Sequence, residues 1–349
     1  MFERLDRSDT TYCIPGIPSI RHRDGPGPGN DDITASDKGS IMETGVVSSC
    51  CCEAPRTVCC PICSQLSCEH FFDKSGYPLF RCRECGLRFI HPQPDDSVLQ
   101  EIYGADYFLG EKNEESEISV SNLKSATASC YLDRLKEYAG SDSGRLLEIG
   151  CGSGDLLAEA RSRGFKVNGV EISPSAAAKA NKLLGEESVL IGTIEKVSLP
   201  EGSFDIIISA DSIEHVRDPV RFLHRVWTLL KPAGVIFIVT PSLDSWSARL
   251  MGRHWMEYKI EHLYYFGKES IKRALRRTGF ESISIEPNFK VLTLRYVRDH
   301  FRRFPVPIGT PVLQLLSRIV PENMLHRRIK MAAGGMLVMG KKQNVSKNK

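Results

Sequence analysis

The stretch LLEIGCGSGDLL (residues 146–157) brings an acid and three glycines close together. Glu148 ends an apolar run, and Gly150, Gly152 and Gly154 follow at every second position. Glycine lets a backbone approach a ligand closely, because it has no side chain and adopts positive φ angles readily. Loops of this general appearance bind a nucleotide phosphate, a dinucleotide or a methyl donor, and the spacing distinguishes between them.

Two of these three ligands do not fit the spacing. A P-loop needs Gly-Lys-Ser/Thr after four intervening residues, and no lysine follows here. The dinucleotide fingerprint needs Gly or Ala three residues after the second glycine, where this chain has Asp155, counted from Gly150 and Gly152. A negative charge at the start of a helix disfavours a second anion there. The ligand that remains is a methyl donor.

S-adenosylmethionine fits the acids around the loop, since its sulfonium and amino groups are cationic. Glu148 supplies negative charge near these groups. Glu171 ends the next expected strand, 17 residues after Gly154, close to the roughly 20 residues expected for a ribose-binding acid in such folds. Glu171 is therefore expected to accept hydrogen bonds from two ribose hydroxyls, although taken alone it would also fit a solvated strand end.

Four segments in order make the chain resemble the class I S-adenosylmethionine-dependent methyltransferases. The stretch from Glu148 to Gly154 is similar to their first motif, and GVEIS (169–173) to their second. Residues 191–219 resemble the adenine-binding segment and fourth strand of the subgroup that includes the ubiquinone-biosynthesis O-methyltransferases. LLKPAGVIFIVTP (229–241) resembles the approach to their fifth strand. The resemblance covers about residues 145 to 287 and the final strand.

The resemblance implies a set of donor-binding positions at the ends of successive strands. Asp211 matches the position that lines the methionyl part of the donor. Where the family often has an Asp against the adenine amine, this chain has Thr193 with Ile194 beside it. The expected donor-binding residues are Glu148, Gly150, Cys151, Gly152, Gly154, Glu171, Ile172, Thr193, Ile194 and Asp211.

His215 follows the fourth expected strand, where acceptors meet the donor in folds of this kind. Its imidazole could accept a hydroxyl proton at neutral pH, because the unperturbed pKa is about 6.5. The alternative is a structural role, in which His215 orients the loop and Glu214 bonds backbone. ADSIEH (210–215) differs from the Asn/Asp-Pro-Pro-aromatic motif of nucleobase amine methylation. Neither Cys130 nor Cys151 is placed as the nucleophile that pyrimidine carbon methylation needs.

Ten of the twelve cysteines precede residue 86, and two pairs have metal-ligand spacing. Cys60-x2-Cys63 and Cys82-x2-Cys85 are separated by 18 residues, which is the spacing of a zinc ribbon with a closed, structural tetrathiolate site. Cys59 could replace Cys60, and Cys68 or His70 could compete, but neither makes two clean pairs. Such clustering also indicates a reducing compartment rather than a disulfide scaffold. We therefore expect a structural Zn2+ and a cytoplasmic protein.

The elements that must position these residues form an α/β domain. From residue 145 strands alternate with helices, which predicts a doubly wound, mostly parallel, seven-stranded Rossmann-like methyltransferase sheet. A zinc ribbon at 56–92 and a helical connection at 93–142 precede the domain at 143–349. Residues 1–55, rich in Gly, Pro, Asp and Ser, are expected to be a disordered extension.

Two segments inside the domain have their own composition. The insertion 246–266 holds six aromatic residues and is expected either to form a lid with an aromatic wall or to supply ordinary core aromatics. The basic segment 295–330 carries eight Lys/Arg against two Asp/Glu. It is either a solvated helix face or a contact for a membrane surface or an anionic substrate.

Charge and hydropathy narrow the expected function. The net charge of +3 does not favour nucleic acid as a partner, and no apolar run approaches the roughly 20 residues of a membrane span. We expect methyl transfer to a small-molecule acceptor at oxygen. The alternatives are an RNA methyltransferase, a sugar or metabolite C- or N-methyltransferase, and a non-catalytic module that only binds the donor. The sequence leaves the acceptor and the oligomeric state open.

Overall fold

The computed structural model of the chain describes residues 58–102, 114–303 and 321–344. The chain divides into two compact units, Met1–Ala54 and Pro55–Lys349, and every described residue belongs to the second unit. The expected disordered extension lies outside the described residues. So does 304–320, in the middle of the basic segment, and the expectation of an anionic contact there stays a prediction.

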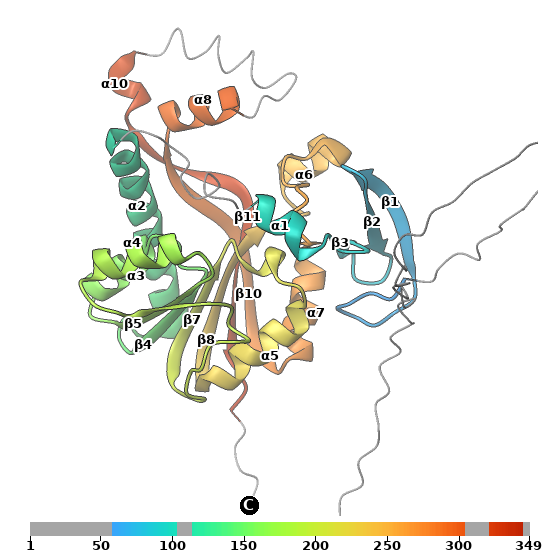
Figure 1. The fold of residues 1–349 in the computed structure, drawn as a ribbon, viewed down its shortest axis with the longest axis horizontal. Helices are drawn as coiled ribbons and strands as arrows, with labels where there is room; N and C mark the ends of the chain where they lie inside the picture. The colour runs from blue at the N-terminus through green and yellow to red at the C-terminus, as the bar shows by residue number, and fades with distance from the viewer. Residues whose placement is uncertain (1–57, 103–113, 304–320, 345–349) are drawn as a thin grey trace, which may run out of the picture. The chain divides into compact units, whose positions relative to one another are not determined.

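The core of the second unit is a seven-stranded sheet with the order β10-β11-β8-β7-β4-β5-β6 (Figure 1). Its central pairs are parallel, and β11 runs antiparallel to both β8 and β10. This confirms the expected mostly parallel seven-stranded sheet. The strands are β4 (Arg145–Ile149), β5 (Lys166–Glu171), β6 (Val189–Ile191), β7 (Phe204–Ala210), β8 (Leu230–Pro241), β10 (Phe280–Thr293) and β11 (Arg328–Lys342).

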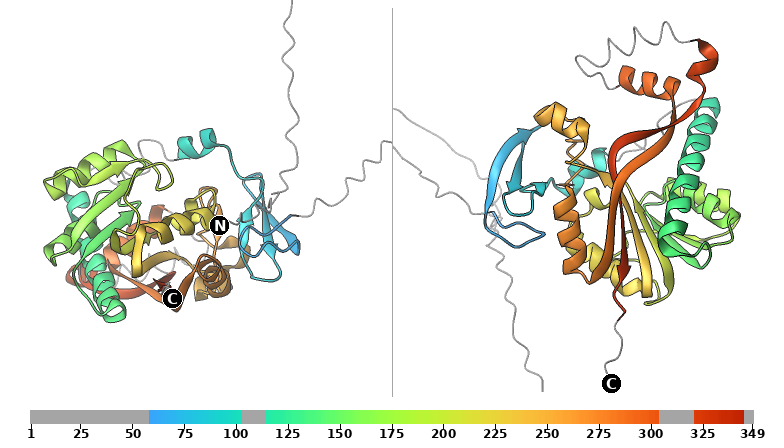
Figure 2. Two further views of the ribbon diagram at one scale, coloured as in Figure 1. Left: turned by 90° about the horizontal axis from the view of Figure 1, so that it is seen from below. Right: turned by 180° about the vertical axis from the view of Figure 1, so that it is seen from behind.

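Helices cover both faces of this sheet, so its central strands are apolar along their length. On one face lie α2 (Glu114–Ala139), α3 (Asp155–Ser162) and α4 (Pro174–Leu184), and on the other α5 (Pro219–Leu229) and α7 (Lys268–Arg277) (Figure 2). Among the described residues, no helix is long and apolar enough to cross a membrane.

Local signals start and stop these helices where the sequence predicts. Ser173 accepts a hydrogen bond from the Ala176 N–H, Pro174 occupies the first turn, and Gly185 ends α4 with a φ of 69°. A side chain is strained at such an angle, and glycine is not. Asp218 likewise caps α5 by accepting from the N–H groups of Val220 and Arg221. The βα units therefore begin and end at sequence-encoded positions.

The last two strands extend beyond the rest of the sheet. β10 and β11 continue as an antiparallel pair in which Phe289–Thr293 faces Arg328–Ala332, beyond the last pair of β11 with β8. The register shifts between Pro287 and Phe289, and this irregularity interrupts the alternation that marks a strand in the sequence. Helices α8 (Leu294–Arg303) and α10 (Glu322–Leu325) lie at the end of this extension (Figure 1).

The N-terminal part of the described chain forms a second, four-stranded sheet. β1 (Cys68–Lys74), β2 (Tyr77–Cys82) and β3 (Arg88–Ile90) pair in sequence, and β9 (Tyr264–Tyr265) from the insertion completes the sheet. We call residues 58–92 the cysteine module. Helix α1 (Asp96–Ile102) follows it, and α6 (Trp246–Met251) opens the insertion.

The aromatic insertion packs against the cysteine module. Trp255, Tyr258 and Tyr265 share a buried cluster with Leu79 and Ile90 of the module. Of the six aromatic residues in the insertion, Trp246 is the exposed one, at 68%. The five buried rings are therefore ordinary core aromatics, as one of the two alternatives predicted. They do not form an aromatic wall over an acceptor.

We expect Phe237→Ala to destabilise the fold by about 3–5 kcal/mol, because truncating a buried phenylalanine loses apolar burial and leaves a cavity. Phe237 is fully buried in the central strand β8 and packs against the Tyr131 ring at 5.6 Å. Urea unfolding followed by circular dichroism measures the change. The matched control is Leu183→Ala, at a side chain that is 52% exposed, with an expected change below about 0.5 kcal/mol. Similar losses in both variants would contradict the assigned core.

Candidate active site and cysteine cluster

The glycine loop after β4 depends on glycine at three positions. Gly150, Gly152 and Gly154 have φ angles of 73°, 53° and 82°, which other residues adopt only with strain. A Cβ at Gly150 would lie 2.4 Å from Ser212 Oγ, and one at Gly154 would lie 2.9 Å from Ala180 Cβ. The loop is therefore closely packed between α4 and the segment after β7.

Glu171, at the end of β5, holds the glycine loop in place. Its Oε2 accepts from the Gly152 N–H at 2.8 Å, and its Oε1 accepts from the Ser173 N–H at 2.9 Å. The carboxylate is 3% exposed. Since a carboxylate offers about four acceptor sites, two remain for the ribose hydroxyls expected there. Glu171 thus has a second role, as a bridge between β4 and β5, that the sequence did not predict.

Glu148 is buried, and one of its oxygens lacks a partner. The side chain is 5% exposed, and among the described residues no hydrogen-bond donor reaches its Oε2. Burial, followed by the charges of Asp155 and Glu171, raises the pKa of Glu148 well above its usual value. A buried acceptor without a partner is costly, and a cationic amino group would satisfy it. Glu148 therefore fits the methyl donor, as a carboxyl that ionises when a cation approaches.

Asp155 occupies the first turn of α3, where a phosphate would otherwise bind. Its carboxylate is 8% exposed and accepts from Ser121 Oγ at 2.5 Å and Ser153 Oγ at 2.7 Å. Lys124 Nζ lies 3.9 Å away. The start of the helix thus holds an internal anion, which agrees with the exclusion of a pyrophosphate from the sequence.

The remaining expected donor residues differ in how they reach the site. The Ile172 side chain is 62% exposed next to Glu171. The Thr193 carbonyl accepts from the N–H groups of Lys196 and Val197 in a turn after β6. Ile194 and Cys151 are 2% and 6% exposed, and their side chains belong to the two cores on either face of the sheet. Because both side chains are buried in a core, Ile194 and Cys151 could contact a bound donor only through their backbone atoms.

Asp211, directly after β7, has a strained backbone and a paired side chain. Its φ of 50° is unusual for a residue other than glycine. Its N–H donates to the Val239 carbonyl at 2.8 Å, and its Oδ2 accepts from Lys290 Nζ at 2.7 Å. The sequence predicted Asp211 at the methionyl part of the donor and gave no signal for Lys290.

His215 lies in the short 3-10 turn Ile213–His215 after β7, with its ring fixed by backbone. Its Nδ1 lies 2.9 Å from the Glu261 carbonyl oxygen. A carbonyl only accepts, so Nδ1 carries the proton and Nε2 holds the lone pair. Burial lowers the pKa of His215 to about 4, although the Glu261 carbonyl opposes it. The ring is therefore neutral at pH 7, and the sequence-based value near 6.5 was too high because the ring is buried.

Glu214 and His262 complete a buried polar group around His215. The Glu214 carboxyl accepts from Thr240 Oγ1 at 2.9 Å, and burial followed by the Asp211 charge raises its pKa to about 8. The His262 ring packs edge-on to the His215 ring with centroids 4.7 Å apart. One polar atom from each of Glu214, His215 and His262 lies within 4.8 Å of the others. All three groups therefore favour their neutral forms at pH 7.

The extension of β10 adds residues that the sequence did not point to. Asn288 is 2% exposed and accepts from the Tyr131 hydroxyl at 2.9 Å. The Val291 N–H donates to Thr127 Oγ1 at 2.9 Å. These bonds join α2 to β10 beside Lys290. Only the pairing of the extended strand brings them to the site, and no motif in the sequence marks that pairing.

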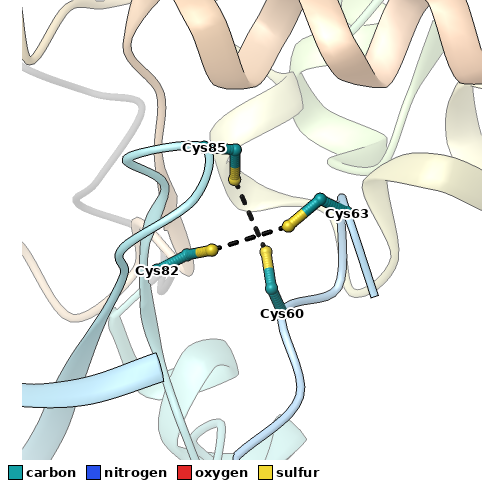
Figure 3. Close-up of side chains that lie close together, drawn as sticks. All are labelled: Cys60, Cys63, Cys82 and Cys85. Atoms are coloured by element: carbon teal, nitrogen blue, oxygen red, sulfur yellow. Dashed lines mark hydrogen bonds between the residues drawn. The ribbon is translucent and has the colours of Figure 1, made fainter. Parts of the chain in front are cut away.

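The four expected metal ligands come together at one point of the cysteine module (Figure 3). Cys60 Sγ lies 3.6 Å from Cys85 Sγ, and Cys63 Sγ lies 3.5 Å from Cys82 Sγ. A tetrahedral site with zinc–sulfur bonds of about 2.3 Å has sulfurs about 3.8 Å apart. Burial opposes ionisation of Cys82, but the N–H groups of Cys85 and Glu84 offset it and lower the pKa of Cys82 to about 7.

Cations surround this cluster where the module meets the larger domain. A cavity of about 610 Å³ is lined by Cys85, by the acidic side chains Asp244 and Glu269, and by a larger number of basic side chains, namely Arg81, Arg88, Lys268 and Lys272. It is separate from the glycine loop, since none of the expected donor residues lines it. Arg277 of α7 donates to the Ile62 carbonyl at 2.7 Å and to Ser64 Oγ at 3.1 Å. Positive charge of this kind stabilises thiolates.

Comparison with known proteins gives the class of the larger domain. A family model described as a methyltransferase domain matches residues 125–285. A ubiquinone biosynthesis O-methyltransferase of Caulobacter vibrioides is 40% identical over 102 residues, which cover 27% of this chain and 40% of that protein. The protein of the same name from Pseudomonas aeruginosa is 32% identical over 178 residues, covering 48% and 76%.

A solved structure is similar to part of this chain at lower identity. It is a methyltransferase of Thermotoga maritima described as a possible histamine N-methyltransferase, with 24% identity, a TM-score of 0.40, and coverage of 57% of this chain and 83% of that one. The strand order, the family model and the Pseudomonas relative agree on the class. The chain belongs to the class I S-adenosylmethionine-dependent methyltransferases.

We expect Glu171→Ala to weaken S-adenosylmethionine binding by about 1.5–3 kcal/mol, because hydrogen bonds to a charged acceptor are lost. The loop held by the Gly152 N–H also loses its bridge. Titration calorimetry measures the affinity. Glu187→Ala is the matched control, since Glu187 is exposed at the end of the same βα unit. Unchanged affinity in Glu171→Ala would remove Glu171 from the donor site.

Proposed function

We propose that the protein transfers a methyl group from S-adenosylmethionine to a small-molecule acceptor, at oxygen. The observation that carries oxygen over other atoms is the His215 ring, whose bond to the Glu261 carbonyl leaves Nε2 as the basic nitrogen. A hydroxyl acceptor needs a general base, whereas a neutral amine is already nucleophilic. The O-methyltransferase names of the relatives support the same choice.

The residues of the chain bind the donor and receive the acceptor proton. Bound S-adenosylmethionine supplies the methyl group for an in-line displacement at its carbon. Glu148, whose Oε2 has no partner among the described residues, would bind the amino group of the donor. Glu171 holds the glycine loop and would also bind the ribose. His215 accepts the hydroxyl proton at Nε2. Because the ring is neutral down to about pH 4, its Nε2 lone pair is present throughout the neutral range, and the lowered pKa makes it a weaker base than an ordinary imidazole.

A direct test separates the small-molecule proposal from its alternatives. The protein is incubated with methyl-labelled S-adenosylmethionine and a bacterial extract divided into a metabolite fraction and an RNA fraction. We expect label in the metabolite fraction, in a product whose mass spectrum shows an O-methyl group. Label in RNA supports the RNA methyltransferase, an N- or C-methyl product supports the other enzyme, and no turnover with normal donor binding supports a binding module.

In the same assay, His215→Ala should lower turnover by about 10²–10⁴, the usual contribution of a general base. The affinity for S-adenosylmethionine should stay nearly unchanged, since the ring faces the acceptor side. In the wild type the acidic limb of the pH–rate profile should lie near pH 4, because the neutral, basic form of His215 is lost as pH falls through its pKa of about 4.

The structural alternative for His215 predicts a different result. A histidine that only supports Asp211 and Glu214 would, on removal, weaken donor binding and leave the shape of the pH profile unchanged. His224→Ala on α5 is the matched control, and it should change neither quantity. A pH profile that is identical in the wild type and His215→Ala would end the assignment of His215 as the base.

We also propose that the cysteine module holds one structural Zn2+. The spacing and proximity of Cys60, Cys63, Cys82 and Cys85 support it, and so do the cations beside Cys85. A zinc tetrathiolate carries two negative charges, which these cations offset. Four ligands close the coordination sphere, so the ion would stabilise the fold and take no part in methyl transfer.

Metal analysis should find one zinc per chain in the wild type and none in the Cys82→Ser/Cys85→Ser double variant. The variant should lose stability in the larger domain as well, because Cys60, Cys82 and Cys85 share one buried core with α5 and α7. Cys59→Ser, at an exposed thiol, should keep its zinc. Zinc retained in the double variant, or absent from the wild type, contradicts the proposal.

A further inference from the structure

Lys290 reaches the acceptor side of the site from the extension of β10. β11 is antiparallel to both β10 and β8, and β8 is parallel to β7. β10 therefore runs in the same direction as β7 and β8. Gly335 faces Pro241 at the end of β8, and a Cβ on Gly335 would lie 3.4 Å from Asn288 Nδ2. Lys290, two residues further, is therefore about 7 Å beyond the carboxyl edge of the sheet. Its side chain extends back to Asp211 at 2.7 Å.

The sheet order places the strand that carries Lys290 on the opposite side of β7 from the glycine loop, and its side chain reaches back to Asp211 at the end of β7. The glycine loop follows β4, Asp211 follows β7, and Lys290 comes from the strand beyond β8 and β11. Under the proposed function the acceptor meets the donor methyl group on this side, next to the segment after β7 that carries His215. Asp211 keeps a strained φ of 50° in the arrangement, and such strain is typical of functional sites.

The groups that face Lys290 keep it protonated. They are Asp211 after β7, the Tyr131 hydroxyl on α2 and Glu257 in the insertion. Burial opposes the charge, but Asp211 and then Tyr131 offset it, and the pKa of Lys290 is raised. Among the described residues, Asp211 is the hydrogen-bond partner of its ammonium. An ammonium has three donors, so it can donate to a ligand while keeping Asp211.

The charges around the site indicate a role for the Lys290 ammonium as a hydrogen-bond donor. Asp211 and Glu257 both act on Lys290 and place carboxylates near its ammonium, so a negative oxygen there would be disfavoured without that cation. Two further cations near the site already have carboxylate partners: Lys259 lies 3.5 Å from Glu257, and Lys124 lies 3.9 Å from Asp155. A donor aimed at the place where negative charge develops is the most effective form of electrostatic stabilisation. Lys290 is placed to provide it.

We propose that Lys290 binds the deprotonated oxygen of the acceptor and thereby selects acidic hydroxyl compounds. This inference rests on the proposed function. In the transfer the hydroxyl proton passes to His215 Nε2, an oxygen electron pair forms the O–CH3 bond, and the S–CH3 bond breaks. The sulfonium becomes a neutral thioether, and S-adenosylhomocysteine leaves. Lys290 stays protonated and exchanges nothing.

The test measures binding of 4-nitrophenol to protein saturated with S-adenosylhomocysteine, followed by phenolate absorbance across pH. We expect the wild type to bind the phenolate form and to lower the apparent pKa of the bound phenol by about one unit, a tenfold preference. Lys290→Arg should keep that preference. Lys290→Met should bind phenolate about tenfold more weakly, and the phenol pKa should return to its free value.

Matched measurements separate this role from a structural one. Lys330→Met removes an exposed cation from the facing strand β11 and should behave as the wild type. S-adenosylhomocysteine affinity should be unchanged in Lys290→Met. Loss of that affinity, equal phenolate binding by the wild type and Lys290→Met, or no phenolate binding by the wild type would each overturn the inference. Failure of the wild type to bind S-adenosylhomocysteine would instead contradict the proposed function, and this inference with it.

Discussion

The site depends on one carboxylate that joins two neighbouring strands. Glu171 accepts from the Gly152 N–H and the Ser173 N–H, so the end of β5, the loop after β4 and the start of α4 hold one position. The loop needs this support because its three glycines have left-handed backbones, which glycine adopts at a cost in unfolded-state freedom. The buried Glu148 beside it has a defined environment only while this loop is fixed. The donor side of the site is thus preorganised by backbone bonds rather than by long side chains.

At the carboxyl ends of the parallel strands, burial favours the neutral form of some titratable side chains, while others form an ion pair. Glu148 and Glu214 have raised pKa values and His215 has a lowered one, in each case mainly because of burial. Asp211 and Lys290 instead form an ion pair. At neutral pH the segment after β7 therefore combines a neutral imidazole with one ion pair. The sign of the linkage follows: the neutral His215 stabilises the fold above its unperturbed pKa, and this contribution is lost as pH falls below about 6.5 towards 4.

The sequence predicted the parts of the site that lie on local motifs, and missed those that arise from strand pairing. The glycine loop, Glu171, Asp211, His215 and the paired cysteines sit at strand ends or in short spacings that can be recognised in one dimension. Lys290 and Asn288 lie beyond the register shift at Pro287, where the alternation stops. The two-residue strand β9 is too short to have a period, and only its pairing with Arg88 and Phe89 defines it. The roles that pairing decides could not be inferred from residue types alone.

The cysteine module is connected to the turn that carries Glu214 and His215 by a short chain of backbone bonds. The Ile90 N–H of β3 donates to the Leu263 carbonyl at 3.0 Å, and the Leu263 N–H donates to the Glu214 carbonyl at 2.8 Å. The Glu261 carbonyl that orients His215 lies two residues before Leu263. The buried rings of the insertion pack on the same module, so these carbonyls have little freedom to move. The cysteine module therefore fixes, through backbone bonds and packing, the segment whose Glu261 carbonyl sets the tautomer of His215.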